Sequence, residues 1–285
     1  MKKSSGPYEN HWFYLKIYTG FRTSDHLLCD VLYPFWKKLE EDKLALRWFF
    51  IRYSDPEYHL RYRIKLDQRI SVKKVDVQIR ESLHQFIEEG LVWRMAKSIY
   101  VPEYDRYGKK GMAAAEQIFC ADSFAVIQFL ELEKHLDEHA RWLFAISSID
   151  SLLNDFKCMD DEKKALLLDL SRRFGKEFGK DRSLARQLSE RYRKYRGLIR
   201  NALTDETPFD HILSTRSVDQ EHAVSVIRKL YEKGKTAVQK QNLLESLIHM
   251  SLNRIFRNNN RLHEMVIYDL LFRAYKESFH RKLRK

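Results

Sequence analysis

The order of two hydrophobic periodicities in the first hundred residues most constrains how this chain folds. Helical patterns at residues 23–42 and 71–90 lie between segments with the alternation and the β-branched or aromatic content of strands. Those segments are HWFYLKIY (11–18), ALRWFFIRY (45–53), HLRYRIKL (59–66) and WRMAKSIYV (93–101). This order predicts a split β-α-β-β-α-β unit, an antiparallel sheet with both helices on one face.

Local signals add detail to this unit. Segment 45–53 is apolar on both faces, which predicts a central strand of the sheet. Ser24 or Asp25 stands where the first helix needs an N-cap, and Pro34 can only kink or interrupt that helix. Gly90 is expected to close the second helix.

From residue 111 onward the patterns are almost wholly helical, over 111–156, 160–203, 217–256 and 261–284. A helical lobe of this size must cover the free face of the sheet or sit beside it. We therefore predict an α+β fold. Residues 1–285 are expected to form a single domain, with a sheet lobe (11–110) and a larger helical lobe (111–285).

Composition excludes several classes of protein. Hydrophobic residues make up 44% of the chain, which excludes disorder, and no apolar run reaches the roughly eighteen residues of a membrane span. Three widely spaced cysteines argue against a disulfide framework, so we expect a cytoplasmic protein. The net charge of +12 favours anionic partners without identifying them. The oligomeric state is open, and a homodimer is one alternative.

The strand at 59–66 carries His59, Arg61 and Arg63 at every second position. Side chains at this spacing stand on one face of a strand, about 6.6 Å apart. A solvated sheet face is the simple explanation. If the helical lobe covers this face, however, two buried guanidinium groups need anionic partners or a ligand.

Two further segments carry candidate functional groups. The loop YVPEYDRYGKKG (100–111) contains Glu103 and Arg106 and leaves the last predicted strand, although an ion pair within a turn also explains it. The apolar helix at 242–260 is interrupted by His249, with Asn253 one turn later on the same side. A buried structural histidine is the commoner case, but an imidazole can also transfer protons near neutral pH.

Other catalytic signatures are weak or missing. HLDEH (135–139) matches an inverted zinc-protease pattern that would place His135 and His139 one helical turn apart, but no motif supplies a further ligand. The sequence has no Walker A loop, Gly-x-Gly-x-x-Gly or Gly-x-Ser-x-Gly motif. We therefore expect neither a metal nor another cofactor.

Several stretches, in order along residues 11–279, resemble the C-terminal elimination domain of class I lanthipeptide dehydratases, which also occurs as free-standing proteins in thiopeptide pathways. They are WFYLKIYTG, LYPFWKKL, WFFIRYSDPEYHLRYRI, YVPEYDRYG, AEQIFCADS, LIHMSLNRIF and HEMVIYDLLFRAYKES. Each is a weak signal, but their shared order is fairly specific. The resemblance implies a lyase that removes glutamate from glutamylated Ser or Thr of a precursor peptide, leaving dehydroalanine or dehydrobutyrine.

The resemblance also assigns positions. The family's His-x-Arg-x-Arg element falls on His59, Arg61 and Arg63, and its helix histidine on His249. Its Glu-x-x-Arg-Tyr-Gly element falls on Glu103, Arg106, Tyr107 and Gly108, and a later acidic position corresponds to Glu264. Lys109 stands where many relatives carry a second glycine, which is a departure from the family's pattern.

Two anionic centres develop in such a reaction, an enolate-like carbanion and the departing glutamate, and both need preorganised donors. Arginine stays protonated and can bind a carboxylate through two hydrogen bonds. We therefore expect Arg61, Arg63 and Arg106 to hold the glutamyl group or stabilise the enolate, and His249 to transfer the proton. Glu103 either orients an arginine or acts as the base. The residues expected to bind substrate are His59, Tyr107, Asn253 and Glu264.

The expected partners are the glutamylated precursor peptide and a separate glutamylating subunit that itself uses glutamyl-tRNA, because 285 residues cannot also hold the glutamylating portion. Pyridine synthases of the same fold are an alternative, but that branch tends to lose the arginines and histidine retained here. A non-catalytic peptide-binding or RNA-binding protein is another. Tyr62 points away from the arginines, which is a poor arrangement for stacking RNA bases.

Overall fold

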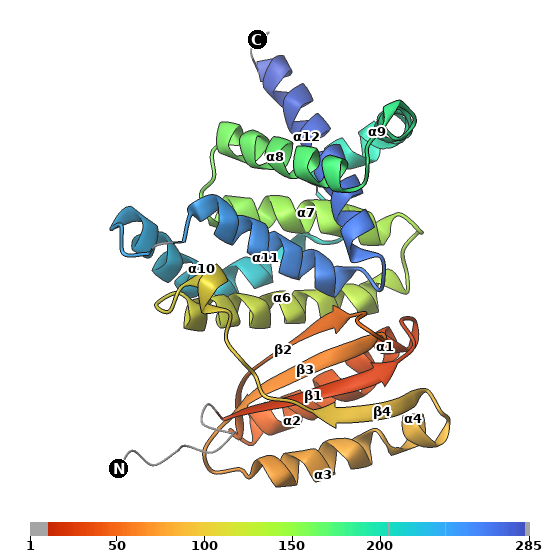
Figure 1. Cartoon of the computed structure of the whole chain (residues 1–285), viewed down its shortest axis with the longest axis vertical. Coiled ribbons are helices and arrows are strands. Elements are labelled where there is room, and N and C mark those ends of the chain that lie inside the picture. The colour runs from red at the N-terminus through yellow and green to blue at the C-terminus, as the bar shows by residue number, and fades with distance from the viewer. Residues whose placement is uncertain (1–10, 205, 237, 283–285) are drawn as a thin grey trace.

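The computed structural model describes residues 11–204, 206–236 and 238–282, with side chains as far as residue 277. It has two parts (Figure 1): a sheet with its helices, residues 12–97, and a helical lobe, residues 104–282. The α+β fold expected from the sequence is confirmed.

The described strands form one four-stranded antiparallel sheet in the order β2-β3-β1-β4. Their bounds are β1 (Trp12–Thr19), β2 (Ala45–Tyr53), β3 (His59–Leu66) and β4 (Val92–Lys97). β4 is shorter than predicted, because its ladder with β1 ends at the pair Leu15 and Lys97. The β-α-β-β-α-β order is thus confirmed.

Both helical connections lie on one face of the sheet, as predicted. On that face Trp36 of α2 (Tyr33–Glu41) stacks on Trp48 of β2, with ring centroids 5.8 Å apart. Lys97, opposite Leu15 on the same face, binds Asp76 of α3 (Val72–Ser82) at 3.2 Å. The short helix α4 (His84–Glu88) follows α3, and Gly90 beyond it has a positive φ of 69°.

The start of the first connection differs from the prediction. α1 (Thr23–His26) continues through a π-helical segment, η1 (Leu27–Leu32), into α2, where Pro34 stands in the first turn. Because the helix is continuous at Pro34, its missing N–H removes a helical hydrogen bond, and the π-helical segment just before it is an irregularity of the kind found at prolines. Ser24 and Asp25 do not cap the helix but are buried inside it.

The helical lobe contains longer helices than the sheet part (Figure 1). The expected stretch 217–256 is two helices, because the chain turns at Gly234, whose φ is 58°. Within the described residues the helices are α5 (Tyr104–Tyr107), α6 (Met112–Glu133), α7 (Ala140–Asp155), α8 (Asp160–Glu177), α9 (Arg182–Thr204), α10 (Asp210–Glu232), α11 (Lys240–Ile255) and α12 (Asn260–Lys282).

The helical lobe sits beside the sheet rather than over its free face. β2 was predicted to be central, and this was wrong, because β2 is an edge strand. Its outer edge is covered by α6 and α11, which explains why it is apolar on both faces. Asn253 of α11 replaces a neighbouring strand: its side-chain oxygen accepts from the Arg52 backbone N–H (2.8 Å), and its nitrogen donates to the Arg52 carbonyl (2.7 Å).

A buried ion network also joins the two parts. Arg52 of β2, which is 1% exposed, donates to Asp25 at 2.6 Å, and Asp25 also binds Arg141 of α7 and Arg257. Burial by itself raises the pKa of Asp25, but the three arginines outweigh it and hold this pKa at about 2. The carboxylate therefore stays charged and fixes the sheet against the lobe.

Candidate active site

His59, Arg61 and Arg63 point to the same face of the sheet, opposite to α2 and α3. Residues directly across a ladder share a face. Arg63 lies across from Tyr14 of β1 and Phe49 of β2, and Arg61 from Lys16 and Ile51. This is the face that the helices of the sheet part leave free, so the predicted row of two cations and an imidazole is present on it.

Arg63 is a buried cation among aromatic rings. It is 8% exposed, and its guanidinium carbon lies 4.5 Å from the ring centroid of Tyr14 and 5.2 Å from those of Phe49 and Tyr100. Its Nε is buried without a hydrogen-bond acceptor, and no described carboxylate lies within ion-pair distance. Burial lowers the pKa of Arg63, whereas Tyr14, which hydrogen-bonds its side chain, and Tyr100 oppose this shift.

Arg61 and His59 form a second, partly open arrangement. The guanidinium of Arg61 lies over the ring of Tyr53 at 3.4 Å, and its Nε donates to His59 Nε2 at 3.3 Å. His59 Nδ1 is 2.8 Å from the carbonyl of Glu57 and therefore carries the proton that Nε2 lacks. Burial lowers the pKa of His59, and the nearby cations lower it further, which favours this neutral tautomer.

Glu116 and Tyr100 complete the surroundings of Arg63, and the sequence did not single them out. Glu116 of α6 is 5% exposed and accepts a hydrogen bond from the Tyr100 hydroxyl. Burial raises the pKa of Glu116. The one available signal was a carboxylate within the apolar helical pattern of residues 112–130. The sequence could not show that α6 brings it to the sheet.

The loop after β4 holds the predicted Glu103 and Arg106, which form an ion pair at 2.9 Å with both side chains about half exposed. Tyr107 is buried, and its hydroxyl has no partner within the described chain. Gly108 has a φ of 69°, a conformation that other residues rarely adopt. Lys109 follows this glycine, and a hollow of about 720 Å³ lies between this loop and the start of α11.

His249 faces the buried carboxylate of Glu264. The distance from His249 Nδ1 to the Glu264 carboxylate is 2.8 Å, and the His249 side chain is 31% exposed while that of Glu264 is fully buried. Arg261 (3.3 Å) and the Tyr268 hydroxyl (3.4 Å) also bind Glu264. Because the carboxylate accepts from Nδ1–H, Nε2 is the atom of His249 that can take up or release a proton.

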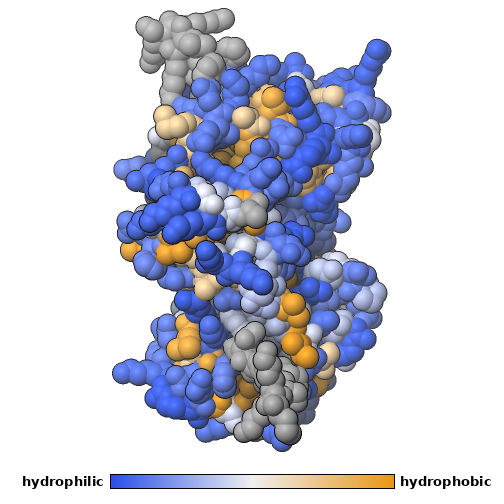
Figure 2. Space-filling view, turned by 60° about the vertical axis from the view of Figure 1, so that its left-hand side comes forward, coloured by the Kyte–Doolittle hydropathy of each residue, from blue (hydrophilic) through white to orange (hydrophobic). Residues whose placement is uncertain are grey.

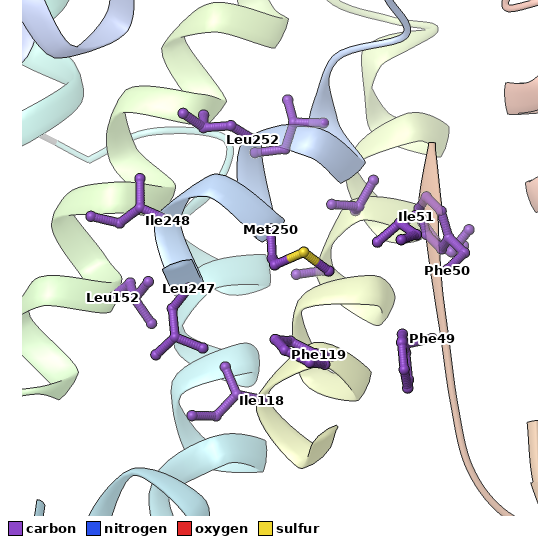
Figure 3. Packing of buried hydrophobic residues seen from close by; sticks show 14 of the residues in the cluster. Phe49, Phe50, Ile51, Ile118, Phe119, Leu152, Leu247, Ile248, Met250 and Leu252 are labelled. Atoms are coloured by element: carbon purple, nitrogen blue, oxygen red, sulfur yellow. The ribbon is translucent and has the colours of Figure 1, made fainter. Parts of the chain in front are cut away.

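The structure brings some of these groups together through one aromatic contact. Phe119 of α6 packs on Phe49 (centroids 5.4 Å apart), on Tyr107 (5.2 Å) and under the guanidinium of Arg254 of α11 (5.0 Å). Side chains of α11, α6 and β2 meet here (Figure 3). Ring contacts thus connect the surroundings of Arg63 to Tyr107 and to the helix of His249.

Arg106 reaches α11 by a different route. It lines the hollow together with Asn242 and Ser246, which precede His249 on α11. Asn253 has a separate task, because both polar atoms of its side-chain amide bind the backbone of β2. Its predicted contact with substrate therefore stays a prediction.

The zinc-protease pattern at 135–139 does not form a helical pair. α6 ends at Glu133 and α7 begins at Ala140, so His135 and His139 lie in the turn between two helices. The expected one-turn spacing was wrong, because the helix breaks within the motif. Among the described residues no group of three or more His, Cys, Asp or Glu is placed to hold a metal ion.

The family model described as lantibiotic biosynthesis dehydratase C-term matches residues 12–275. The chain belongs to this family. It is 25% identical over 265 residues to the subtilin biosynthesis protein SpaB of Bacillus subtilis, and 26% identical over 269 residues to the nisin biosynthesis protein NisB of Lactococcus lactis subsp. lactis. Each match covers 92% of this chain, which spans about a quarter (25%) of the length of these relatives.

Solved structures share the fold of this family member. The tRNA-dependent lantibiotic dehydratase MibB of Microbispora sp. 107891 superposes with a TM-score of 0.77 at 22% identity, over 99% of this chain and 29% of MibB. The pyridine synthase TbtD from thiomuracin biosynthesis superposes with a TM-score of 0.65 at 14% identity, over 95% of this chain and 99% of TbtD. TsrL superposes with a TM-score of 0.63 at 15% identity, over 94% of this chain and 95% of TsrL.

One described helix, α6, is long and apolar enough to span a membrane by length and composition. The apolar window of α6 is 72% buried within the fold, as in the core helix of a soluble protein, so this is weak evidence for a membrane span.

Proposed function

We propose that this chain is a lyase that eliminates glutamate from glutamylated Ser or Thr of a ribosomally made precursor peptide. A base removes the α-proton, the C–H electrons form the Cα=Cβ double bond, and the bond from Cβ to the ester oxygen breaks. Glutamate leaves as its carboxylate with the electrons of that bond. The product is dehydroalanine from Ser or dehydrobutyrine from Thr, and the proton stays on the base.

The observation that carries this proposal is the environment of Arg63. A guanidinium that is 8% exposed, with a buried Nε that lacks an acceptor, has lost hydration without gaining an ion pair in the described chain. Such a cation is costly unless an anion completes the site. The leaving glutamate and the enolate oxygen are both anions that a guanidinium can bind.

The remaining roles follow from the contacts of each group. Arg61 shares a face with Arg63 and is the second donor for the glutamyl group or the enolate. His249 is the proton-transfer group, because Glu264 holds its Nδ1–H and leaves Nε2 to react. The half-exposed pair of Glu103 and Arg106 can open toward substrate, with Arg106 binding an anion and Glu103 positioning it or acting as the base.

The relatives agree with a peptide substrate. SpaB and NisB are named for the biosynthesis of subtilin and nisin, and MibB is described as tRNA dependent. We propose that a glutamylating partner, using glutamyl-tRNA, supplies the glutamylated peptide. The three free cysteines fit a cytoplasmic reaction.

One observation favours a second candidate. The superposition with TbtD covers 99% of TbtD and 95% of this chain. A pyridine synthase, which joins two dehydroalanines, therefore shares this fold over nearly its whole length. Our proposal instead relies on the arginines and the histidine of the candidate site, which elimination needs to bind the departing carboxylate and move a proton.

The deciding experiment incubates the purified protein with a peptide that carries one chemically glutamylated serine, followed by mass spectrometry. We expect loss of one glutamic acid per peptide. Arg63→Ala and His249→Ala should retain the glutamyl adduct, while Arg69→Ala, a change at an exposed arginine, should not. Persistent adducts with the wild-type protein, or ring closure on a peptide that already contains dehydroalanines, would refute elimination.

A further inference from the structure

The outer edge of β4 continues past the end of the strand. β4 is the last strand in the sheet order, and the described chain places no strand beside its outer edge. The last bond to β1 runs from the Ser98 N–H to the Tyr14 carbonyl (3.0 Å). Beyond it, exposed and covered residues alternate as far as residue 103, which is the pattern of an extended chain. The segment then rises toward α5 (Figure 1).

The backbone of this segment is unpaired. No hydrogen bond within the described chain uses the N–H or C=O of Ile99, Tyr100 or Val101. In an antiparallel strand successive residues point their backbone groups to opposite edges. Because Ser98 points to β1, the same alternation, carried along the extended segment, turns the backbone groups of Lys97, Ile99 and Val101 away from β1. These three residues form what we call the outer edge.

An edge of this kind is a hazard for a protein without a partner. The side chain of Ile99 is 59% exposed and that of Val101 is 73% exposed, and Trp93 on β4 is 53% exposed. Hydrophobic residues also reach the surface near the narrow region between the two parts, on the side turned forward in Figure 2. Unpaired edges with apolar side chains pair with other strands unless charges or bulges block them. The outer edge carries a single charge, Lys97.

The outer edge also leads into the candidate active site. Tyr100, between Ile99 and Val101, points to the other side, packs against Arg63 and donates to Glu116. Three residues further on, the same segment supplies Glu103, which pairs with Arg106. An extended peptide that pairs with Ile99 and Val101 would therefore lie next to Tyr100, which packs on Arg63, and close in sequence to the pair of Glu103 and Arg106.

We propose that the outer edge, Lys97, Ile99 and Val101, binds the precursor peptide as an added β-strand. The peptide backbone would exchange hydrogen bonds with the free groups of Ile99 and Val101, and alternate side chains would point toward Tyr100 and Arg63. The inference rests on the proposed function, because that function supplies the peptide. Backbone pairing carries little side-chain information, so it would accept Ser and Thr residues in different sequence contexts.

The first test is an N-methyl scan of a fluorescently labelled precursor peptide, with binding measured by fluorescence anisotropy. A methyl group on an amide that faces the edge removes one hydrogen bond and sterically blocks another. We expect binding to weaken at least tenfold at every second position and by less than twofold at the positions between. Loss without this two-residue period, or no loss anywhere, would overturn the proposal.

The second test compares Val101→Pro with Val101→Ala. Both remove the branched side chain of an exposed valine, but proline also removes the outward N–H, and an extended Tyr100 tolerates a following proline. We expect the proline variant to bind the peptide at least fivefold more weakly and the alanine variant to stay within twofold. Ile99→Pro and Ile99→Ala repeat the comparison, with circular dichroism to confirm folding. Equal binding by proline and alanine variants at both positions would overturn the proposal.

Two readouts separate this inference from the proposed function. Periodic peptide binding by a protein that eliminates no glutamate supports the edge and refutes elimination. Elimination without periodic binding refutes the edge and leaves elimination in place. Sedimentation equilibrium tests a second copy of the chain as the occupant: a dimer that Val101→Pro dissociates, and that excludes the peptide, would overturn the proposal.

Discussion

Replacing Arg63 with methionine should separate stability from activity, because this arginine has little to lose inside the fold. Its side chain packs between Tyr14, Phe49 and Tyr100 and hydrogen-bonds Tyr14, but its Nε has no acceptor. Methionine has a similar length and fills the same apolar space without a charge. The change therefore removes a buried cation while keeping most of the packing.

The expected magnitude follows from two opposing contributions. An unsatisfied buried donor destabilises a fold by about 1–3 kcal/mol, and removing it recovers that amount. Loss of the cation–π contacts opposes this by about 1–2 kcal/mol. We thus expect the free energy of unfolding to change by between about −1 and +2 kcal/mol. Elimination should fall at least about 100-fold, or about 2.7 kcal/mol, as when one donor to a developing anion is lost.

The assay pairs urea unfolding, followed by circular dichroism, with single-turnover mass spectrometry of the glutamylated peptide. Arg52→Met is the matched control, because Arg52 is buried on the neighbouring strand but paired with Asp25. Breaking that pair leaves a buried carboxylate with one partner fewer, so we expect a loss of about 3–5 kcal/mol in unfolding free energy.

The reasoning fails if Arg63→Met unfolds as readily as Arg52→Met and the folded fraction keeps its elimination rate. Arg63 would then be a structural cation whose ring contacts stabilise the sheet. Elimination by the variant at the wild-type rate with unchanged stability would equally remove Arg63 from the site.

Three further outcomes are expected. Removing the Glu264 carboxylate with Glu264→Gln should lower the single-turnover rate constant of elimination about 10-fold to 1000-fold, because His249 Nδ1 loses its charged partner. Glu116→Ala should weaken binding of the glutamylated peptide, whereas Glu116→Gln should bind nearly normally because its amide oxygen can still accept from the Tyr100 hydroxyl. Equal loss of binding in both variants would contradict a role through that hydrogen bond. The ion pairs of Asp25 lower its pKa from the usual 3.8 to about 2 in the folded protein. They therefore contribute about 2 kcal/mol of stability, which is present above about pH 4 and is lost as the pH falls toward 2. Acid unfolding of wild type compared with Asp25→Asn measures this contribution.

The fold class could be predicted because local periodicity encodes it. Alternation at 59–66 and helical spacing at 71–90 reflect which side of each element is buried, and these patterns recur in β3, α3 and α4. Errors arose where burial had a non-local cause. Segment 45–53 looks central because it is apolar on both faces, yet in the structure α6 and α11 bury its outer edge.

Single-residue roles were harder to predict, for the same reason. Asn253 was expected beside His249 because the two share a side of one helix, but its amide is engaged by the backbone of Arg52, two hundred positions earlier in the chain. Asp25 was expected to cap a helix and instead binds three arginines from β2, α7 and the turn after α11. Such partners depend on the docking of the lobe, which leaves no periodic signal.

The sequence by itself determined the α+β class, the row of His59, Arg61 and Arg63 on one strand face, and the family, because these depend on residue order and spacing. Only the tertiary structure decided that the lobe docks on the edge of β2, that Tyr14, Phe49 and Tyr100 enclose Arg63, and that Glu264 holds His249. The physical reason is distance along the chain: contacts between residues far apart in sequence are fixed by packing of whole elements, which no local pattern records.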